Sequence, residues 1–202
     1  MTNRFSISLS AFIIMSMFIV AVVHALDAQG FMDKGNAAFN AGRYDEAIQN
    51  YGKAISMNPD FTDAYYNRGL SYYRKGRYAE AVSDLTKVVA ADPNNTAVYY
   101  NRGLAYYKKG QHEKAIEDYT KAISIDPNIA EVYLNRGIAY AYNKQYDEAI
   151  EDYNKAILLR VNYADAYFNR GVAYLRKSAA DFGKVCDMGN KYACENLKQI
   201  SD

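Results

Sequence analysis

The sequence repeats itself with a period of 34 residues, and this period constrains the fold more than any other feature. Segment 62–95 aligns without gaps with 96–129, and more than half of the positions are identical. Segments 130–163 and 28–61 are further copies, and 164–177 repeats the first half of the unit. A repeat of this length predicts a supersecondary unit that stacks on its neighbours, instead of a globular domain with one core.

Each copy contains the pattern of two helices. In segment 96–129, apolar residues recur three and four positions apart in two stretches, which is the spacing of an amphipathic helix. Gly110 separates the stretches and suits the left-handed position just past a helix end, and Pro127 follows the second stretch. We therefore expect each complete copy to form a helical hairpin.

Small residues recur at two fixed positions of the unit. Position 8 is glycine in all five copies: Gly35, Gly69, Gly103, Gly137 and Gly171. Position 20 is alanine in the four complete copies: Ala47, Ala81, Ala115 and Ala149. Since glycine inside a helix costs about 1 kcal/mol relative to alanine, its recurrence predicts a close crossing of the two helices, with the alanines as the opposing wall.

These residues resemble the tetratricopeptide repeat (TPR) family. The resemblance rests on positions 4, 8, 11, 20, 24, 27 and 32, which in the third copy are Tyr99, Gly103, Tyr106, Ala115, Tyr119, Ala122 and Pro127. It covers about residues 28–177 and implies an all-α, right-handed α-solenoid of helical hairpins. The fourth copy departs from it, with Lys144 in place of the turn glycine and Val161 in place of the proline.

The tail, residues 178–202, no longer follows the repeat. It predicts a C-terminal capping pair of helices separated by Gly189 and Asn190. The two cysteines of the chain, Cys186 and Cys194, lie on either side of this turn, and the tail resembles the disulfide-bearing helix-pair repeats of secreted cysteine-rich proteins. Across a hairpin the two thiols could meet, which in an oxidising compartment favours a disulfide. A pair of buried thiols is the alternative.

Residues 1–25 have the pattern of a secretory signal peptide. Arg4 precedes a long apolar run, and Val23 and Ala25 supply the small residues of a cleavage site. The alternative is an uncleaved membrane anchor, because the run approaches the length of a membrane span. Both interpretations place the repeats outside the cytoplasm, in the periplasm or secreted.

Charge and residue types argue against several classes of function. The 24 basic and 23 acidic residues nearly balance, so the chain lacks the basic surface of a nucleic-acid-binding protein. The segment after residue 25 contains one histidine, His112, at a position that is tyrosine in other copies, which indicates a packing role instead of a general base. We expect no catalytic residues, no metal site and no cofactor.

Arginine and aspartate recur in step with the repeat. Position 7 is arginine (Arg68, Arg102, Arg136, Arg170) and position 23 is aspartate in the three central copies (Asp84, Asp118, Asp152). A row of arginines could bind a ligand, but an intramolecular arginine–carboxylate ladder is the favoured interpretation. The sequence leaves open whether each arginine pairs with the aspartate of its own copy or of the previous one.

The resemblance to TPR proteins implies that the first helices line a concave groove through positions 2, 5, 9, 12 and 13. The candidate groove residues are Tyr66, Leu70, Tyr73, Arg74, Tyr100, Leu104, Tyr107, Lys108, Leu134, Ile138, Tyr142, Phe168, Val172 and Arg176. Aromatic anchors with a few cations predict a protein or peptide partner that is apolar-aromatic with acidic residues nearby. Some of these rings could instead pack on neighbouring helices.

Some TPR co-chaperones clamp a peptide carboxylate with three cations and two asparagines. The corresponding residues are Met32, Asn36, Asn67, Ala97 and Asn101, so both asparagines are present and the three cations are missing. We therefore expect an exported, non-catalytic TPR scaffold without this clamp. The alternative is a structural or self-assembling cell-envelope protein, a homo-oligomer in which the groove or an end face packs against another copy.

Overall fold

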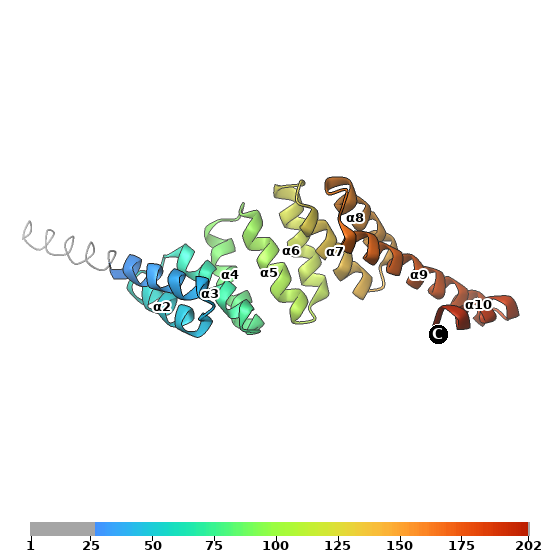
Figure 1. Ribbon diagram of the computed structural model, residues 1–202, viewed down its shortest axis with the longest axis horizontal. Helices are drawn as coiled ribbons and strands as arrows, with labels where there is room; N and C mark the ends of the chain where they lie inside the picture. Colours follow the sequence, from blue (N-terminus) through green and yellow to red (C-terminus); the bar gives the residue numbers. More distant parts are fainter. Residues whose placement is uncertain (1–26, 202) are drawn as a thin grey trace, which may run out of the picture. The chain divides into compact units, whose positions relative to one another are not determined.

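The computed structural model describes residues 27–201, and every regular element in that range is a helix (Figure 1). A first helix covers residues 27–40. It is followed by α2 (Tyr44–Met57), α3 (Thr62–Arg74), α4 (Tyr78–Ala91), α5 (Thr96–Lys108), α6 (His112–Ile125), α7 (Ala130–Tyr142), α8 (Tyr146–Leu159), α9 (Ala164–Asp187) and α10 (Lys191–Ser201). The helices fall into two compact units that divide after Ala91. The predicted all-α hairpins are confirmed.

The turn inside each hairpin uses the left-handed backbone conformation. Gly42, Gly76 and Gly110 have φ angles of 73–74° at this position. In the fourth copy Lys144 adopts the same conformation with φ 61°, although side chains disfavour it. The fourth hairpin also ends normally without proline, because Arg160 takes the extended conformation that Asp126 has in the copy before it. Both departures from the repeat therefore leave the hairpin intact.

The position-8 glycines lie where the two helices of a hairpin approach most closely. A Cβ on Gly103 would lie 2.7 Å from Tyr119 Cε1, and one on Gly69 would lie 3.1 Å from Leu85 Cγ. The predicted close crossing is confirmed, but its wall is the position-24 side chain. The position-20 alanines contribute mainly a backbone carbonyl, such as Ala149 O at 3.2 Å from a Cβ on Gly137. The alanine methyl group is too short to reach the space over the glycine, whereas the position-24 side chain fills it.

Alanines and a few larger side chains form the core. In the first unit the buried cluster is Met32, Ala38, Ala47, Tyr51, Ala54 and Ala64. In the second unit it includes Leu134, Ala149, Ile150, Tyr153, Ala156, Ala166 and Ala173. Alanine allows helix axes to approach closely, and each buried tyrosine ring adds a large apolar area to the core.

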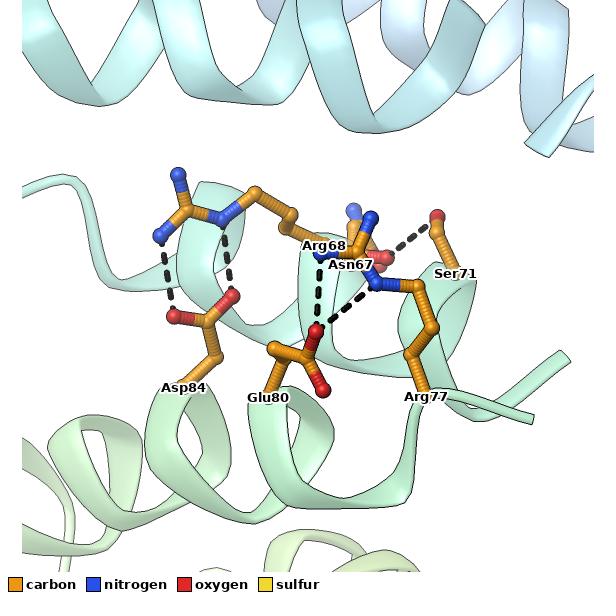
Figure 2. Close-up of polar contacts among 6 residues, drawn as sticks. All are labelled: Asn67, Arg68, Ser71, Arg77, Glu80 and Asp84. Carbon is orange, nitrogen blue, oxygen red and sulfur yellow. Dashed lines mark hydrogen bonds and ion pairs between the residues drawn. The ribbon is translucent and has the colours of Figure 1, made fainter. Parts of the chain in front are cut away.

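The arginine–aspartate ladder is present in the three central copies, where each arginine pairs with the aspartate of its own copy. Arg68 donates from Nε and Nη2 to the two carboxylate oxygens of Asp84, at 2.7 and 2.9 Å (Figure 2). Arg102 and Arg136 hold Asp118 and Asp152 with the same two nitrogens. The side-chain hydrogen bond to its aspartate raises the pKa of Arg68 above its ordinary value, so the guanidinium stays charged. These arginines tie the second helix of each hairpin to the first.

The C-terminal part differs from the expected boundaries. The prediction ended the repeat at residue 177 and placed both capping helices in residues 178–202, whereas α9 runs continuously from Ala164 to Asp187. The chain then turns at Gly189, which has φ 90°, and the Asn190 side chain accepts a hydrogen bond from Ala193 N at 3.0 Å. Helix α10 packs back on α9. The expected disulfide joins Cys186 and Cys194, whose Cα atoms are 4.8 Å apart.

Among the residues that the structure describes, no helix is long and apolar enough to cross a bilayer. The predicted signal peptide or anchor, residues 1–25, lies outside the described range.

Candidate functional site

In the first unit the candidate groove residues lie on α3. Tyr66, Leu70 and Tyr73 are half-buried, and Arg74 is exposed. The Tyr73 ring packs edge-on against Tyr78, with centroids 5.5 Å apart, and burial raises its pKa. This face therefore presents the edges of apolar side chains beside one exposed cation.

In the second unit the candidate residues lie on three consecutive first helices. Helix α5 contacts α7, and α7 contacts α9, so the three helices form one surface. Phe168 and Tyr142 are strongly exposed on it, at 71% and 64%. Leu134 is the exception, because it is buried in the core of this unit and has no surface for a partner.

Several of the candidate rings also contact the neighbouring repeat. The Tyr100 hydroxyl accepts a hydrogen bond from Asn135 Nδ2 at 3.1 Å. Tyr107 packs edge-on against Tyr142 at 5.5 Å, and His112 stacks on Tyr142 at 5.0 Å. Burial and the neighbouring Tyr142 phenol raise the pKa of Tyr107. These contacts give the rings fixed orientations, which lowers the entropy lost when a partner binds.

His112 joins this aromatic cluster, which the sequence pattern did not reveal. The pattern placed His112 on the second helix as a packing residue, and in the structure its ring contacts both Tyr107 and Tyr142. Its Nδ1 is buried and has no hydrogen-bond partner within residues 27–201. The stacked ring holds Tyr142 at the edge of the candidate surface.

A pocket of about 430 Å³ opens between α7, α8 and α9. It is lined by Ile138, Ala141, Tyr142, Lys144, Tyr146, Tyr153, Asn169, Val172, Ala173 and Arg176. Ile138, Tyr142, Val172 and Arg176 are predicted groove residues, so the structure brings these four together. Lys144 was not predicted, although its replacement of the turn glycine was the visible signal. The lining combines an apolar floor with two cations and contains no carboxylate.

Three of the five residues that correspond to the co-chaperone clamp lie in the first unit and make contacts within it. Asn36 Oδ1 accepts hydrogen bonds from the Tyr51 hydroxyl at 2.9 Å and from Asn67 Nδ2 at 3.3 Å. Met32 is buried. The asparagines therefore serve packing between two hairpins. Within residues 27–201, no group of three or more histidine, cysteine or acidic side chains is arranged to hold a metal ion.

Several solved structures have a similar fold. The chain superposes on a crystal structure of MamA with a TM-score of 0.73 and 26% identity, covering 86% of this chain and 90% of that one. MamA from Desulfovibrio magneticus RS-1 gives 0.66 and 29%, covering 68% and 78%. The first TPR domain of Spaghetti (RPAP3), bound to the HSP90 peptide SRMEEVD, gives 0.55 and 26%, covering 56% and 90%.

No curated protein sequence matches the chain. Sequence models described as tetratricopeptide repeat match residues 32–96, 96–129 and 118–151, and one described as TPR repeat matches residues 139–178. Together these matches span both units and end within α9, before the chain turns at Gly189. With its repeated hairpins, position-8 glycines and arginine–aspartate pairs, the chain belongs to the tetratricopeptide repeat family.

Proposed function

We propose that this protein is a non-catalytic, exported scaffold that binds a peptide or protein segment on the surface of its first helices. The observation that carries the proposal is the pocket between α7, α8 and α9, where Ile138 and Val172 form an apolar floor beside Tyr142. Arg176 and Lys144 place positive charge at the same pocket. Fixed aromatic rings with nearby cations are features of peptide-binding surfaces.

The lining predicts the chemistry of the bound segment. One aromatic or branched apolar side chain would fill the pocket, and an acidic residue one or two positions away would lie near Arg176 or Lys144. RPAP3 domains of the same fold are bound to the acidic peptides SRMEEVD and SGPTIEEVD, which supports an acidic peptide ligand. Because the clamp cations are missing here, we propose recognition of an internal segment instead of a terminal carboxylate.

Export is the second part of the proposal. The N-terminal segment supports it through its signal-peptide pattern. The disulfide between Cys186 and Cys194 supports it as well, because such bonds persist mainly in oxidising compartments. We place the protein in the periplasm or outside the cell, with membrane contact only where residues 1–25 are retained as an anchor.

The test uses a displayed library of random dodecapeptides selected on the purified protein. We expect the selected peptides to combine Phe, Tyr, Trp or Leu with Asp or Glu. Arg176→Glu should weaken the best peptide about tenfold, since an attraction becomes a repulsion. Lys198→Glu on α10 makes the same kind of charge change away from the pocket and should bind as wild type. Peptides that bind both variants equally would contradict the proposed pocket.

The alternative, a self-assembling envelope protein, gives a different result in solution. Light scattering across a hundredfold range of concentration should then show particle mass rising with concentration, and Arg176→Glu should suppress the rise if the groove is the contact. For the proposed scaffold we expect a constant mass.

A further inference from the structure

In each complete repeat, the second helix covers one face of the first helix. Helix α9, the first helix of the fifth repeat, leaves the same face exposed. In the four complete repeats, the ring or branch of Tyr51, Leu85, Tyr119 or Tyr153 lies over the position-8 glycine. Within residues 27–201, nothing packs within 4 Å of a Cβ built on Gly171 of α9. The nearby Tyr167 is 45% exposed, whereas its counterpart Tyr99 in the third copy is 8% exposed. Within residues 27–201, the fifth repeat therefore has a first helix but no second helix packed over its position-8 glycine.

Arg170 keeps one of the three side-chain hydrogen bonds that its counterpart Arg136 makes. Its Nη1 donates to Asn154 Oδ1 at 2.5 Å, the equivalent of the Arg136 Nη1 contact with Thr120 Oγ1 at 3.0 Å. In Arg136, Nε and Nη2 hold Asp152, but within residues 27–201 no carboxylate lies at salt-bridge distance from Arg170. The guanidinium is thus held by the same neighbour, with the two nitrogens that bind aspartate elsewhere still available.

The same face continues along the extra length of α9. Tyr174, Ser178, Asp181 and Val185 follow Tyr167 and Gly171 at three- and four-residue spacing, which keeps them on one side of the helix. With Phe182 and the start of α10, they line a cavity of about 490 Å³. Tyr174, Val185 and Tyr192 are all exposed there. An acceptor surface for a helix thus extends beyond the length of an ordinary repeat.

We infer that this face binds one amphipathic helix of a partner protein, which takes the place of the second helix of the fifth repeat. The chain itself shows the required chemistry, Ala-x-x-Asp followed by Tyr or Leu, as in Ala115 to Tyr119 of α6 and Ala149 to Tyr153 of α8. The aspartate would accept from Nε and Nη2 of Arg170, and the ring would cover Gly171. This site lies on a different face of the repeats from the proposed groove and does not depend on it.

A second copy of this chain is a poor occupant of this face. Its helices with the Ala-x-x-Asp sequence are already packed within their own hairpins. Asp84, Asp118 and Asp152 are buried against the arginines of their own hairpins. Helix α10 has no aspartate and buries Ala193 against α9. Unfolding one hairpin to provide a helix would sacrifice its whole packed interface, so the donor must be another protein.

The probe is a fluorescein-labelled peptide with the sequence of α8, Tyr146–Leu159, acetylated and amidated. A lactam between Glu151 and Lys155, both exposed and four residues apart, keeps it helical, since a free helix of this length is marginal. Fluorescence anisotropy against the full chain should show saturable binding. Asp152→Asn in the peptide should weaken binding about tenfold through loss of a charged hydrogen bond.

Variants of the protein locate the peptide. Arg170→Gln should weaken wild-type peptide about tenfold but add little to Asp152→Asn, because the two changes remove one interaction. Gly171→Leu should abolish binding, and Gly183→Leu, with open space around it and nine residues from Tyr174 on the opposite side of α9, should not. The groove variant Arg176→Glu should bind this probe normally, so the result stands apart from the proposed groove function.

Three outcomes would overturn the inference: no binding at millimolar protein, equal binding by Gly171→Leu, or full additivity of Arg170→Gln and Asp152→Asn. A wild-type dimer in sedimentation that Gly171→Leu dissociates would also overturn it, since the occupant would then be a second copy.

Discussion

Replacing Gly103 with alanine tests the packing rule on which the hairpins rest. The added Cβ would lie 2.7 Å from Tyr119 Cε1 and 2.9 Å from Cδ1, well inside van der Waals contact. The Tyr119 ring is fully buried, so it can move away only by disturbing its neighbours. Overpacking of this kind costs about 1–3 kcal/mol. Opposing it, alanine gains about 1 kcal/mol over glycine inside a helix.

Gly171 provides the matched control, because it has the same repeat position and open space around it within residues 27–201. Gly171→Ala gains the helix-propensity term alone and should stabilise the chain by about 0.5–1 kcal/mol. The free energies of unfolding of the two variants should therefore differ by about 1–3 kcal/mol, the overpacking term. Gly69→Ala should fall between them, since Leu85 Cγ lies at 3.1 Å and a branched aliphatic side chain can shift by a few tenths of an ångström.

Urea denaturation followed by circular dichroism at 222 nm measures these differences through the transition midpoint. Gly103 and Gly171 lie in the same unit, so partial unfolding of the array affects both variants alike. Equal midpoints for Gly103→Ala and Gly171→Ala would refute the argument, because position 8 would then tolerate a side chain beneath the ring.

Four further outcomes are expected. Asp118→Asn should cost about 3 kcal/mol of folding free energy, because it removes the charged partner of the largely buried Arg102 side chain. Arg170→Gln should instead change urea stability by less than about 0.5 kcal/mol, and similar losses for the two variants would contradict the ladder. Serine at both disulfide cysteines should cost about 2–3 kcal/mol, with faster hydrogen exchange confined to α10 and the end of α9, and protein purified without reductant should contain no free thiol. Burial raises the pKa of Tyr51 to about 12, whereas tyrosines in the unfolded chain titrate near pH 10. Between these pH values the folded state keeps a phenol proton that the unfolded state has lost, so the melting temperature should fall as pH rises from about 10 to 12. A constant melting temperature over that range would contradict this. Intact mass of the exported protein should place the N-terminus near Leu26, and a retained residue 1 would mean an anchor.

The sequence predicts the hairpins because turn, crossing and ladder residues recur in phase. It does not predict how deeply a side chain is buried or how far it extends from its helix. Leu134 occupies the groove position that is tyrosine in the two preceding copies, but its shorter side chain stays in the core. For the same reason the wall of the glycine crossing is the long position-24 side chain and not the position-20 alanine. A periodic pattern assigns a residue to a face, and side-chain length decides how far it extends.

The continuous helix α9 shows what determines a hairpin turn. Lys144 and Ser178 occupy the same repeat position and neither is glycine, yet the chain turns at Lys144 and stays helical at Ser178. The two sites differ in the residues on their C-terminal side. After Lys144 come Ala149, Asp152 and Tyr153, which bury a second helix, while the residues after Ser178 lack this pattern. Packing of the second helix therefore stabilises the strained turn, and without that packing the local preference for helix prevails.

This dependence explains why one set of repeat positions can have two roles. Positions 8 and 24 pack the hairpins together in the complete copies, and positions 7 and 23 add an ion pair in the three central ones. Changes at these positions should alter stability and leave groove binding intact. Positions 9 and 13 reach the pocket, where changes should alter binding and leave stability intact. In the fifth copy no second helix within residues 27–201 covers these positions, so Gly171 is exposed and Arg170 is partly exposed, although both belong to the first set. Their substitution should therefore weaken the binding of a partner helix and hardly change the folding of the chain. The reason is that the contacts which stabilise the other hairpins are not made within residues 27–201 at this copy, so a partner helix can make them instead.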